Sequence, residues 1–394
     1  MHRLRTIFAT AALLLDVFAH PADANEKPSP CTTLASQFDA SPAPAFLASY
    51  PGTAIRELKD VAFLYDNAAA TLALIGCDDV ARARRIGDAI LFAQDHDRYW
   101  HDGRLRNAYL AGAPANPVKL AGWWDGTLNR WVEDRYQVGS DTGNLAWAAL
   151  ALLALDRATQ DPRYRAGALR LGALLEQWRD PRGPGGFTGG LFGHEPKPDR
   201  LAWKSTEHNT DLAAAYRALA RATGDKRWLA DAAAAEAMVR ASWLSDCRCF
   251  AAGTGLDGAA PNPFLALDAQ VFPLLALDDT ARYRAVPATL RQRLARDGGY
   301  AYSETRAGLW TEGTAQAALL MRMLHRDAEA AALDRALDSM RAPDGTYYAA
   351  TAASQATGFM LDADPTQPRR YFHIPALAPL AWAALAERRF NPFR

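Results

Sequence analysis

Neither sign of charge dominates this chain of 394 residues, because 44 Lys and Arg residues balance 44 Asp and Glu residues. Binding to nucleic acid through the release of counterions needs a basic surface, so the balance argues against a nucleic-acid partner. Prolines are too few, at 23, and hydrophobic residues too many, at 49 %, for a disordered or fibrous chain. The composition therefore predicts a folded protein with a large core.

Several catalytic and cofactor-binding motifs are also missing. The chain has no Gly-x-Ser-x-Gly elbow, which argues against an α/β-hydrolase. Its glycines do not stand in the strand–turn–helix context of a phosphate-binding loop. Cys and His residues do not form a second cluster with zinc-like spacing. We expect neither a cofactor nor a metal.

The first 24 residues have the pattern of an export signal. Two arginines precede an apolar stretch at residues 7–15, and an Ala-Asp-Ala sequence at residues 22–24 offers a small-x-small cleavage site. Asp16 interrupts the apolar run, so an uncleaved anchor is the alternative. No later segment has the roughly 18 uninterrupted apolar residues of a membrane span. We expect a periplasmic or secreted protein without a membrane span after cleavage.

Four cysteines in an exported chain can form two disulfides in three ways. We expect Cys31 to pair with Cys77, which leaves Cys247 and Cys249. A bridge across a single residue is tight, so reduced or strained cysteines are the alternative at that pair.

Six stretches are apolar around nearly their whole circumference, which predicts helices buried on all sides. They are residues 59–76, 142–155, 209–222, 265–277, 313–325 and 374–387. Each of the first five is followed by a stretch whose charges fall on one helical face, typical of a surface layer. These outer helices are predicted at residues 79–94, 162–179, 226–242, 280–296 and 328–341. Residues 40–50 are expected to supply the sixth.

Six pairs of a buried and a half-exposed helix predict an inner and an outer ring. The arrangement resembles the six-hairpin toroid, the (α/α)6 barrel shared by many secreted glycoside hydrolases and some polysaccharide lyases. The resemblance implies an all-α fold with short β-hairpins in its loops, forming a single catalytic domain over residues 25–394. A helical bundle or solenoid has the same local pattern and is the alternative.

Polar residues gather where the buried helices begin, and the N-termini of the inner helices of a toroid meet around one mouth. The carboxylates among them are Asp141, Glu207, Asp268 and Glu312, and the other candidates for substrate binding are His208, Asn209, Asp211, Gln270, Trp310, Gln316, Tyr371 and His373. Polar residues at helix starts are often ordinary caps, and Asp141 alone is better explained in that way. A cap does not explain Glu207 or Glu312, because an unpaired buried carboxylate is costly.

Glycoside hydrolysis gives such carboxylates a purpose, since one carboxylic acid protonates the leaving oxygen and a second carboxylate activates water or attacks the sugar. Glu207 is the candidate acid, because Asp211 lies one helical turn later and would raise its pKa. Glu312 is the first candidate base. Asp141 competes for that role, and Asp268 would position either partner or bind a sugar hydroxyl. An acid at the start of the third inner helix looks like the glucoamylase-type arrangement, although the residues around Glu207 do not form a glucoamylase motif.

The long segment between residues 97 and 141 is rich in aromatic residues. Its Trp123, Trp124 and Asp125 combine apolar rings with a polar group, as a platform for sugar rings requires. Long loops in compact domains are commonly functional. The alternative is that the tryptophans pin the loop to the protein.

We therefore expect a glycoside hydrolase that acts on a polysaccharide or oligosaccharide, either as a monomer or in an oligomeric state that the sequence leaves open, and the resemblance implies inversion at the anomeric carbon. A lyase acting on a uronic-acid polymer is one alternative, with His208 or Tyr371 transferring the proton and Lys204 and Arg370 holding the carboxylate. A sugar epimerase would centre on histidines. A glycan-binding or assembly protein without turnover is the third alternative.

Overall fold

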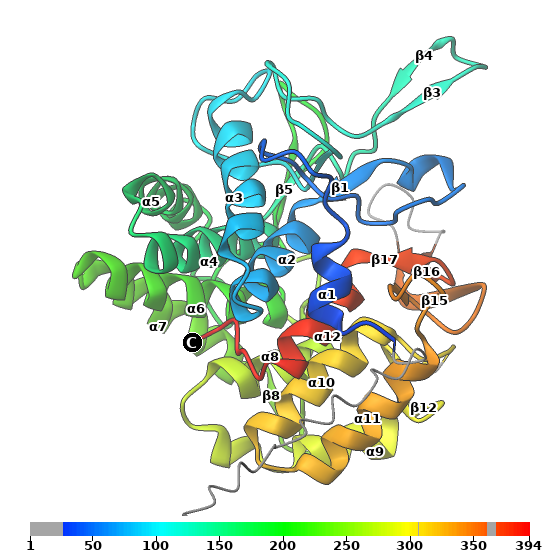
Figure 1. Ribbon diagram of the computed structural model, residues 1–394. Coiled ribbons are helices and arrows are strands. Elements are labelled where there is room, and N and C mark those ends of the chain that lie inside the picture. Colours follow the sequence, from blue (N-terminus) through cyan, green and yellow to red (C-terminus); the bar gives the residue numbers. More distant parts are fainter. Residues whose placement is uncertain (1–26, 306, 361–367) are drawn as a thin grey trace, which may run out of the picture.

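The computed structural model describes residues 27–305, 307–360 and 368–394 (Figure 1). The predicted signal peptide lies outside these ranges. In the described part of the chain, no helix combines the length and the apolar character that crossing a bilayer requires.

Six helices of the described residues form a closed inner ring. Each packs against the next in the chain, and the last packs against the first, which closes the ring. They are α2 (Leu64–Gly76), α4 (Thr142–Thr159), α6 (Thr206–Thr223), α8 (Asp268–Ala276), α10 (Thr311–Met323) and α12 (Leu377–Glu387). In α4 every residue from Thr142 to Leu155 is buried, as the apolar circumference predicts.

The outer helices follow or precede their inner partners along the chain. They are α1 (Pro30–Ala35), α3 (Val80–Asp95), α5 (Pro162–Glu176), α7 (Arg227–Ala241), α9 (Val286–Arg293) and α11 (Asp327–Ser339). The outer position of these helices around the ring can be followed in Figure 1. The six-hairpin (α/α)6 toroid is thus confirmed.

Two of the predicted outer helices are wrong in detail. Residues 40–50 are not helical, because Pro42 and Pro44 remove backbone donors and bias the residues before them towards extended conformations. The sixth outer helix is instead α1, which Ser29 caps through the Thr32 N–H and which packs on α12. The predicted helix at 280–296 is split into a 3-10 turn, η2 (Thr280–Tyr283), and the short α9, whose first turn contains Pro287.

Short antiparallel strands decorate the loops, together with a second 3-10 turn, η1 (Arg56–Leu58). One sheet has three strands, β5 (Ser140–Asp141), β6 (Gly190–Phe192) and β7 (Asp199–Leu201). The pairs are β1 (Val61–Phe63) with β2 (Ala108–Leu110), β3 (Trp123–Asp125) with β4 (Arg130–Val132), β8 (Trp243–Leu244) with β9 (Cys249–Phe250), β10 (Gly253–Thr254) with β11 (Pro261–Asn262), β12 (Ala295–Arg296) with β13 (Gly299–Tyr300), β14 (Tyr347–Tyr348) with β17 (Pro375–Ala376), and β15 (Ser354–Met360) with β16 (Pro368–Phe372).

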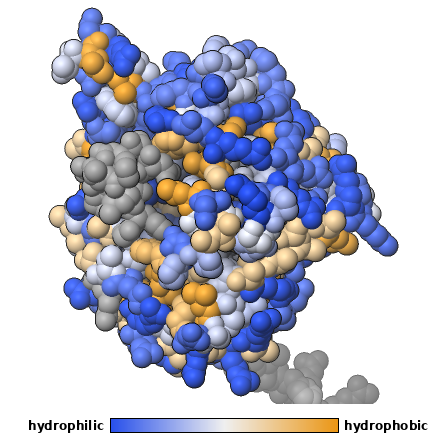
Figure 2. Space-filling view, turned by 180° about the vertical axis from the view of Figure 1, so that it is seen from behind, coloured by the Kyte–Doolittle hydropathy of each residue, from blue (hydrophilic) through white to orange (hydrophobic). Residues whose placement is uncertain are grey.

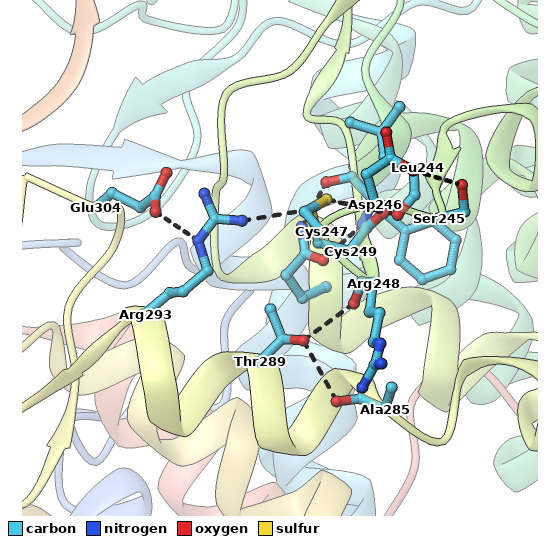
Figure 3. The surroundings of a disulfide bond; sticks show 12 residues. Leu244, Ser245, Asp246, Cys247, Arg248, Cys249, Ala285, Thr289, Arg293 and Glu304 are labelled. Atoms are coloured by element: carbon cyan, nitrogen blue, oxygen red, sulfur yellow. Dashed lines mark hydrogen bonds and ion pairs between the residues drawn. A yellow bond between two sulfur atoms is a disulfide. The ribbon is translucent and has the colours of Figure 1, made fainter.

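All four cysteines form disulfides. Cys31 in α1 pairs with Cys77 at the end of α2, as expected, and so ties the sixth hairpin to the first. Cys247 pairs with Cys249 and closes the turn between β8 and β9 (Figure 3). In this turn the Arg248 carbonyl accepts a hydrogen bond from the Thr289 hydroxyl of α9 at 3.1 Å, so α9 supports the bridge from one side.

A repeated amide contact fixes loops to the first turns of the inner helices. In each case the side-chain amide oxygen accepts from one backbone N–H at 2.8 Å, and the amide nitrogen donates to the carbonyl of the same residue at 2.7–3.0 Å. The pairs are Asn67 with Leu47, Asn209 with Phe187, and Gln270 with Phe250. Each amide thereby satisfies two buried backbone groups that lack a ladder partner. We call these contacts the amide clamps.

Replacing Asn67 or Asn209 by Ala should lower the free energy of unfolding by about 2–4 kcal/mol, because two buried backbone groups would lose their partners. Urea denaturation followed by circular dichroism measures this loss. A loss below about 1 kcal/mol for both variants would show that water or loop rearrangement replaces the clamps.

Candidate active site

Carboxyl groups at the starts of five inner helices meet at one end of the toroid. Asp66 comes from the first turn of α2, Glu207 from α6, and Glu312 from α10. Asp268 is the first residue of α8, and Asp141 directly precedes α4. Their effects on one another's pKa, and on the pKa of Tyr136, show that these side chains share one region although they are distant in sequence. The described residues contain no group of three His, Cys, Asp or Glu side chains arranged to hold a metal ion.

Glu312 is held by two hydrogen-bond donors. The Tyr65 hydroxyl donates to its Oε1 at 2.6 Å, and the Gln316 amide donates to the same oxygen at 3.1 Å. The Trp382 indole N–H in turn donates to the Tyr65 hydroxyl at 2.8 Å, which directs the hydroxyl proton towards Glu312. Burial raises the pKa of Glu312 to about 8, with contributions from Asp66 and Asp268, whereas the two donors lower it.

Glu207 has a different environment. Its side chain keeps partial exposure to solvent, and no hydrogen bond between described residues reaches its carboxyl group. Burial raises its pKa well above the usual value, and the nearby charges of Asp268, Asp211 and Glu312 raise it further. Arg369 on β16 opposes them. The balance favours a protonated Glu207.

Asp211 lies one helical turn below Glu207 and is fully buried. Neither of its oxygens has a hydrogen-bond partner among the described residues. The Trp147 indole lies beside it and lowers its pKa, but the indole N–H does not reach hydrogen-bond geometry. Burial and the charge of Asp268 raise the pKa of Asp211 well above its ordinary value, which favours the neutral form of this carboxyl.

Asp66 and Asp268 complete the group of buried carboxyls. Burial raises the pKa of Asp66 to about 7, against a lowering by Ser49. Burial also raises the pKa of Asp268 to about 6, and its carboxylate accepts a hydrogen bond from the Ala269 N–H at 2.7 Å. These two groups titrate close to neutral pH.

Asp141 occupies the N-cap position of α4, yet its side chain does not cap the helix. Its backbone N–H donates to Asn107 Oδ1 at 2.7 Å, and its carboxylate raises the pKa of Tyr136. Glu207 also raises the pKa of Tyr136, which places both carboxyls near the same phenol. The explanation of Asp141 as an ordinary cap is therefore wrong.

His208 is held in one tautomer. The Thr142 hydroxyl donates its proton to the Thr188 carbonyl at 2.9 Å, so it can only accept from His208 Nδ1–H at 3.1 Å. Nε2 therefore carries no proton and acts as an acceptor. Burial, and next the charge of Arg369, lower the pKa of His208 to about 4. The ring packs so closely on Gly143 that a Cβ there would lie 2.5 Å from His208 Cδ2.

Aromatic rings line the side of the carboxyl cluster that is nearest to α10. Trp310 stacks on Tyr371 with 5.4 Å between ring centroids, and Tyr302 packs edge-on against Trp310 at 4.9 Å. Burial and the Glu312 charge raise the pKa of Tyr371, which places this phenol near Glu312. His373 is exposed and stacks on Tyr348 at 3.9 Å instead.

Other residues predicted to bind substrate have structural contacts. Asn209 and Gln270 form amide clamps, so their polar groups are occupied by the backbone. Trp123, Trp124 and Asp125 lie on the β3–β4 hairpin, which projects from the body of the protein (Figure 1). Asp125 accepts hydrogen bonds from the Thr127 and Leu128 N–H groups and so shapes the hairpin turn.

Sequence reasoning missed Tyr65, Asp66 and Arg369, and it noted Tyr136 only as one of the aromatic residues of the segment between residues 97 and 141. The first two follow the same rule as the other site residues, but the predicted helix start at residue 59 placed them inside the helix instead of in its first turn. Arg369 lies on a β-strand, its guanidinium 4.7 Å from the centroid of the Tyr136 ring, and no helical pattern indicates it.

A cavity of about 500 Å³ lies at the opposite end of the inner ring, where α8 and α10 end. Its lining includes Leu274, Met323, Arg389 and Phe390 and none of the carboxyls described above. The chemistry therefore favours the end where the inner helices begin.

No protein-family model and no curated protein matches this sequence. Solved structures with the same fold do match. A wild-type glycosidase has a TM-score of 0.62 at 14 % identity, over 92 % of this chain and 95 % of that one. The GH76 alpha-mannanase of Bacteroides thetaiotaomicron has a TM-score of 0.56 at 13 % identity, over 91 % of this chain and 93 % of that one. Cellobiose 2-epimerase of Bacillus thermoamylovorans has a TM-score of 0.59 at 12 % identity, over 91 % of this chain and 95 % of that one. The chain thus shares the six-hairpin toroid of glycosidases and sugar epimerases.

The His208 imidazole should remain neutral and protonated on Nδ1 as the pH falls from 7 to 5, because its pKa is lowered to about 4. Nitrogen-15 NMR of the labelled histidines distinguishes the two ring nitrogens. A His208 signal that titrates near pH 6.5, or that shows the Nε2–H tautomer, would contradict this assignment.

Proposed function

We propose that the protein hydrolyses a glycosidic bond in a polysaccharide or oligosaccharide, with Glu207 as general acid and Glu312 as general base. The observation that carries the proposal is the unequal hydrogen bonding of two glutamates in one buried carboxyl cluster. Glu312 accepts two hydrogen bonds, whereas no described residue donates to Glu207. Hydrogen bonds donated to a carboxylate stabilise its charged form. Of the two glutamates, Glu312 is therefore the one that hydrogen bonding favours as the charged carboxylate, and Glu207 is the one favoured as the acid.

The proton on Glu207 suits protonation of the leaving glycosidic oxygen. Asp211 and Asp268 make its ionisation unfavourable, and partial exposure leaves the carboxyl open to a ligand. As the bond to the leaving oxygen breaks, the proton moves from Glu207 to that oxygen and the charge on Glu207 appears beside Arg369, which stabilises it.

The charge on Glu312 suits the removal of a proton from water. The relay from Trp382 through Tyr65 fixes Oε1, so that carboxylate orientation does not depend on the substrate. In the inverting reaction that the toroid resemblance implies, Glu312 takes the proton of the water that attacks the anomeric carbon.

The remaining polar groups have supporting roles in this proposal. Asp268 and Asp141 hold hydroxyl groups of the sugar, and Gln316 binds Glu312. His208 offers Nε2 as an acceptor to a substrate hydroxyl, and the stacked Trp310 and Tyr371 form the apolar wall. Asp211 acts through the pKa of Glu207.

The structure of the site bears on the alternatives. Among the described residues, His208 lies beside the carboxyls, whereas His373 stacks on Tyr348. An epimerase centre built on two histidines therefore lacks support. The cations named for a lyase lie elsewhere, because Lys204 is buried against the Asp180 carbonyl and Arg370 is exposed beside Ser354. A lyase remains the second candidate on one observation, which is the Arg369 guanidinium next to Glu207.

The two disulfides and the predicted export signal together support a location outside the cytoplasm, where disulfides persist. We propose that residues 25–394 form the catalytic domain after the signal is removed.

Replacing Glu207 or Glu312 by Gln should preserve folding and lower kcat by about 10²–10⁴-fold, because each change removes one proton transfer. The assay incubates the mature protein with neutral and acidic polysaccharides and follows reducing ends together with the absorbance of unsaturated uronides. Glu176→Gln on the outer helix α5 is the matched control and should keep full activity. Reducing ends without unsaturated product support hydrolysis, both signals together indicate a lyase, and full activity of folded Glu207→Gln would contradict the mechanism.

Tyr65→Phe should move the acidic limb of the pH profile of kcat/KM to higher pH. The Tyr65 hydroxyl lowers the pKa of Glu312, so its removal raises that pKa further, and the base must lose its proton at a higher pH. Tyr164→Phe is the control, since its hydroxyl binds Asp88 on the outer layer. An unchanged acidic limb in Tyr65→Phe would separate Glu312 from the catalytic base.

A further inference from the structure

The β3–β4 hairpin presents two tryptophans to solvent on one face. Trp124 and Trp131 are directly opposite in the antiparallel register, so their side chains leave the same face of the hairpin. They are 57 % and 49 % exposed. Among the described residues, six large hydrophobic side chains are exposed, and three of them lie on this hairpin, with Leu128 at its turn as the third. Figure 2 shows the hairpin from behind, as a protrusion in which hydrophobic atoms stand among hydrophilic ones.

The backbone holds the Trp131 ring in position. A Cβ at Gly122 would lie 2.5 Å from Trp131 Nε1 and 2.8 Å from Cε2, so the indole packs closely against a backbone position that glycine leaves open. Trp123, on the other face of the hairpin, lies under the Arg56 guanidinium at 5.5 Å. The hairpin thus directs one tryptophan towards the body and two towards solvent.

Ion pairs fix the base of the hairpin to the body of the protein. Glu133, which directly follows β4, accepts two hydrogen bonds from Arg98 at 2.6 and 2.7 Å. Arg98 also binds Glu195, and Glu195 binds the buried Arg106. Exposed ion pairs in isolation stabilise little, but bidentate geometry and a buried member make this network an anchor. Ligand binding to the hairpin therefore requires little ordering.

The hairpin is continuous with the candidate active site. Tyr136 comes five positions after Trp131, so the two are at most about 18 Å apart along the backbone. The Arg369 guanidinium lies 4.7 Å from the centroid of the Tyr136 ring, and the charges of Asp141 and Glu207 raise the pKa of Tyr136. A glycan chain that occupies the carboxyl cluster can therefore extend to the hairpin.

We propose that Trp124 and Trp131 form a glycan-binding platform outside the active site. The platform holds one part of a polysaccharide chain while a distant part of the same chain is cleaved at the site that contains Glu207. This inference rests on the proposed function and adds that the substrate is a polymer with uncharged sugar rings. Apolar C–H faces of such rings stack on the indoles. On the hairpin itself Asp125 lies directly opposite Arg130, so its one acidic and one basic side chain balance, and both offer hydrogen-bonding groups to sugar hydroxyls.

The test compares wild-type protein with the double variant Trp124→Ala/Trp131→Ala, using Tyr99→Ala as the control at an exposed aromatic residue off the hairpin. Affinity electrophoresis through gels that contain neutral polymers of glucose, mannose or galactose measures binding without turnover. We expect the double variant to lose at least about tenfold in affinity, and to show a KM raised by the same factor on the polymer but unchanged on a short oligosaccharide of the same linkage.

The outcomes separate this inference from the proposed function. Binding that is lost in the double variant, from a wild-type protein that cleaves none of the polymers, would support the platform and count against hydrolysis. Equal retardation of both proteins, or no retardation of the wild-type protein by any of the polymers, would overturn the platform. A wild-type dimer that the double variant turns into a monomer in analytical ultracentrifugation would also overturn it, because the tryptophans would then bind a second copy of the chain.

Discussion

The arrangement of this site depends on one constraint, which is that several carboxyl groups lie close together where water is scarce. Burial is the largest cause that raises the pKa of Asp66, Glu207, Asp211 and Glu312. Each carboxylate that forms also makes ionisation of the next carboxyl less favourable. The cluster cannot ionise completely near neutral pH, so it must share protons. The hydrogen-bond donors then decide which carboxyl keeps its proton and which one is charged.

The toroid supplies both the crowding and the means to tolerate it. Inner helices that are apolar all round point their N-termini to one place, and each N-terminus carries a partial positive charge that favours an anion. The same first turns have a structural task, because Asn67, Asn209 and Gln270 bind the backbone of neighbouring loops there. Structural amides and buried carboxyls thus alternate within a few residues at these helix starts.

The sequence was sufficient to predict the rings, because apolar residues around a whole helix require burial on all sides. It failed where proline governs the backbone, at residues 40–50 and near Pro287, and there the real outer helices are α1 and the short α9. Convergence of the carboxyls at the inner N-termini followed from topology. The distinction between Asn209, which clamps a loop, and His208, which faces Thr142 and Gly143, could not be read from the sequence, since both are polar residues in the same helical turn. Arg369 approaches from a hairpin, so its place beside Glu207 depends on tertiary packing alone.

The central claim is that Glu207 and Glu312 share the protons of a buried cluster and differ in which of them keeps one. Carbon-13 NMR of the mature protein, labelled at the glutamate side-chain carboxyls and assigned with the two Gln variants, measures both titrations directly. The account predicts that both carboxyls titrate well above the ordinary glutamate pKa of about 4.3, with Glu312 ionising first. Two independent titrations near that ordinary value would contradict it.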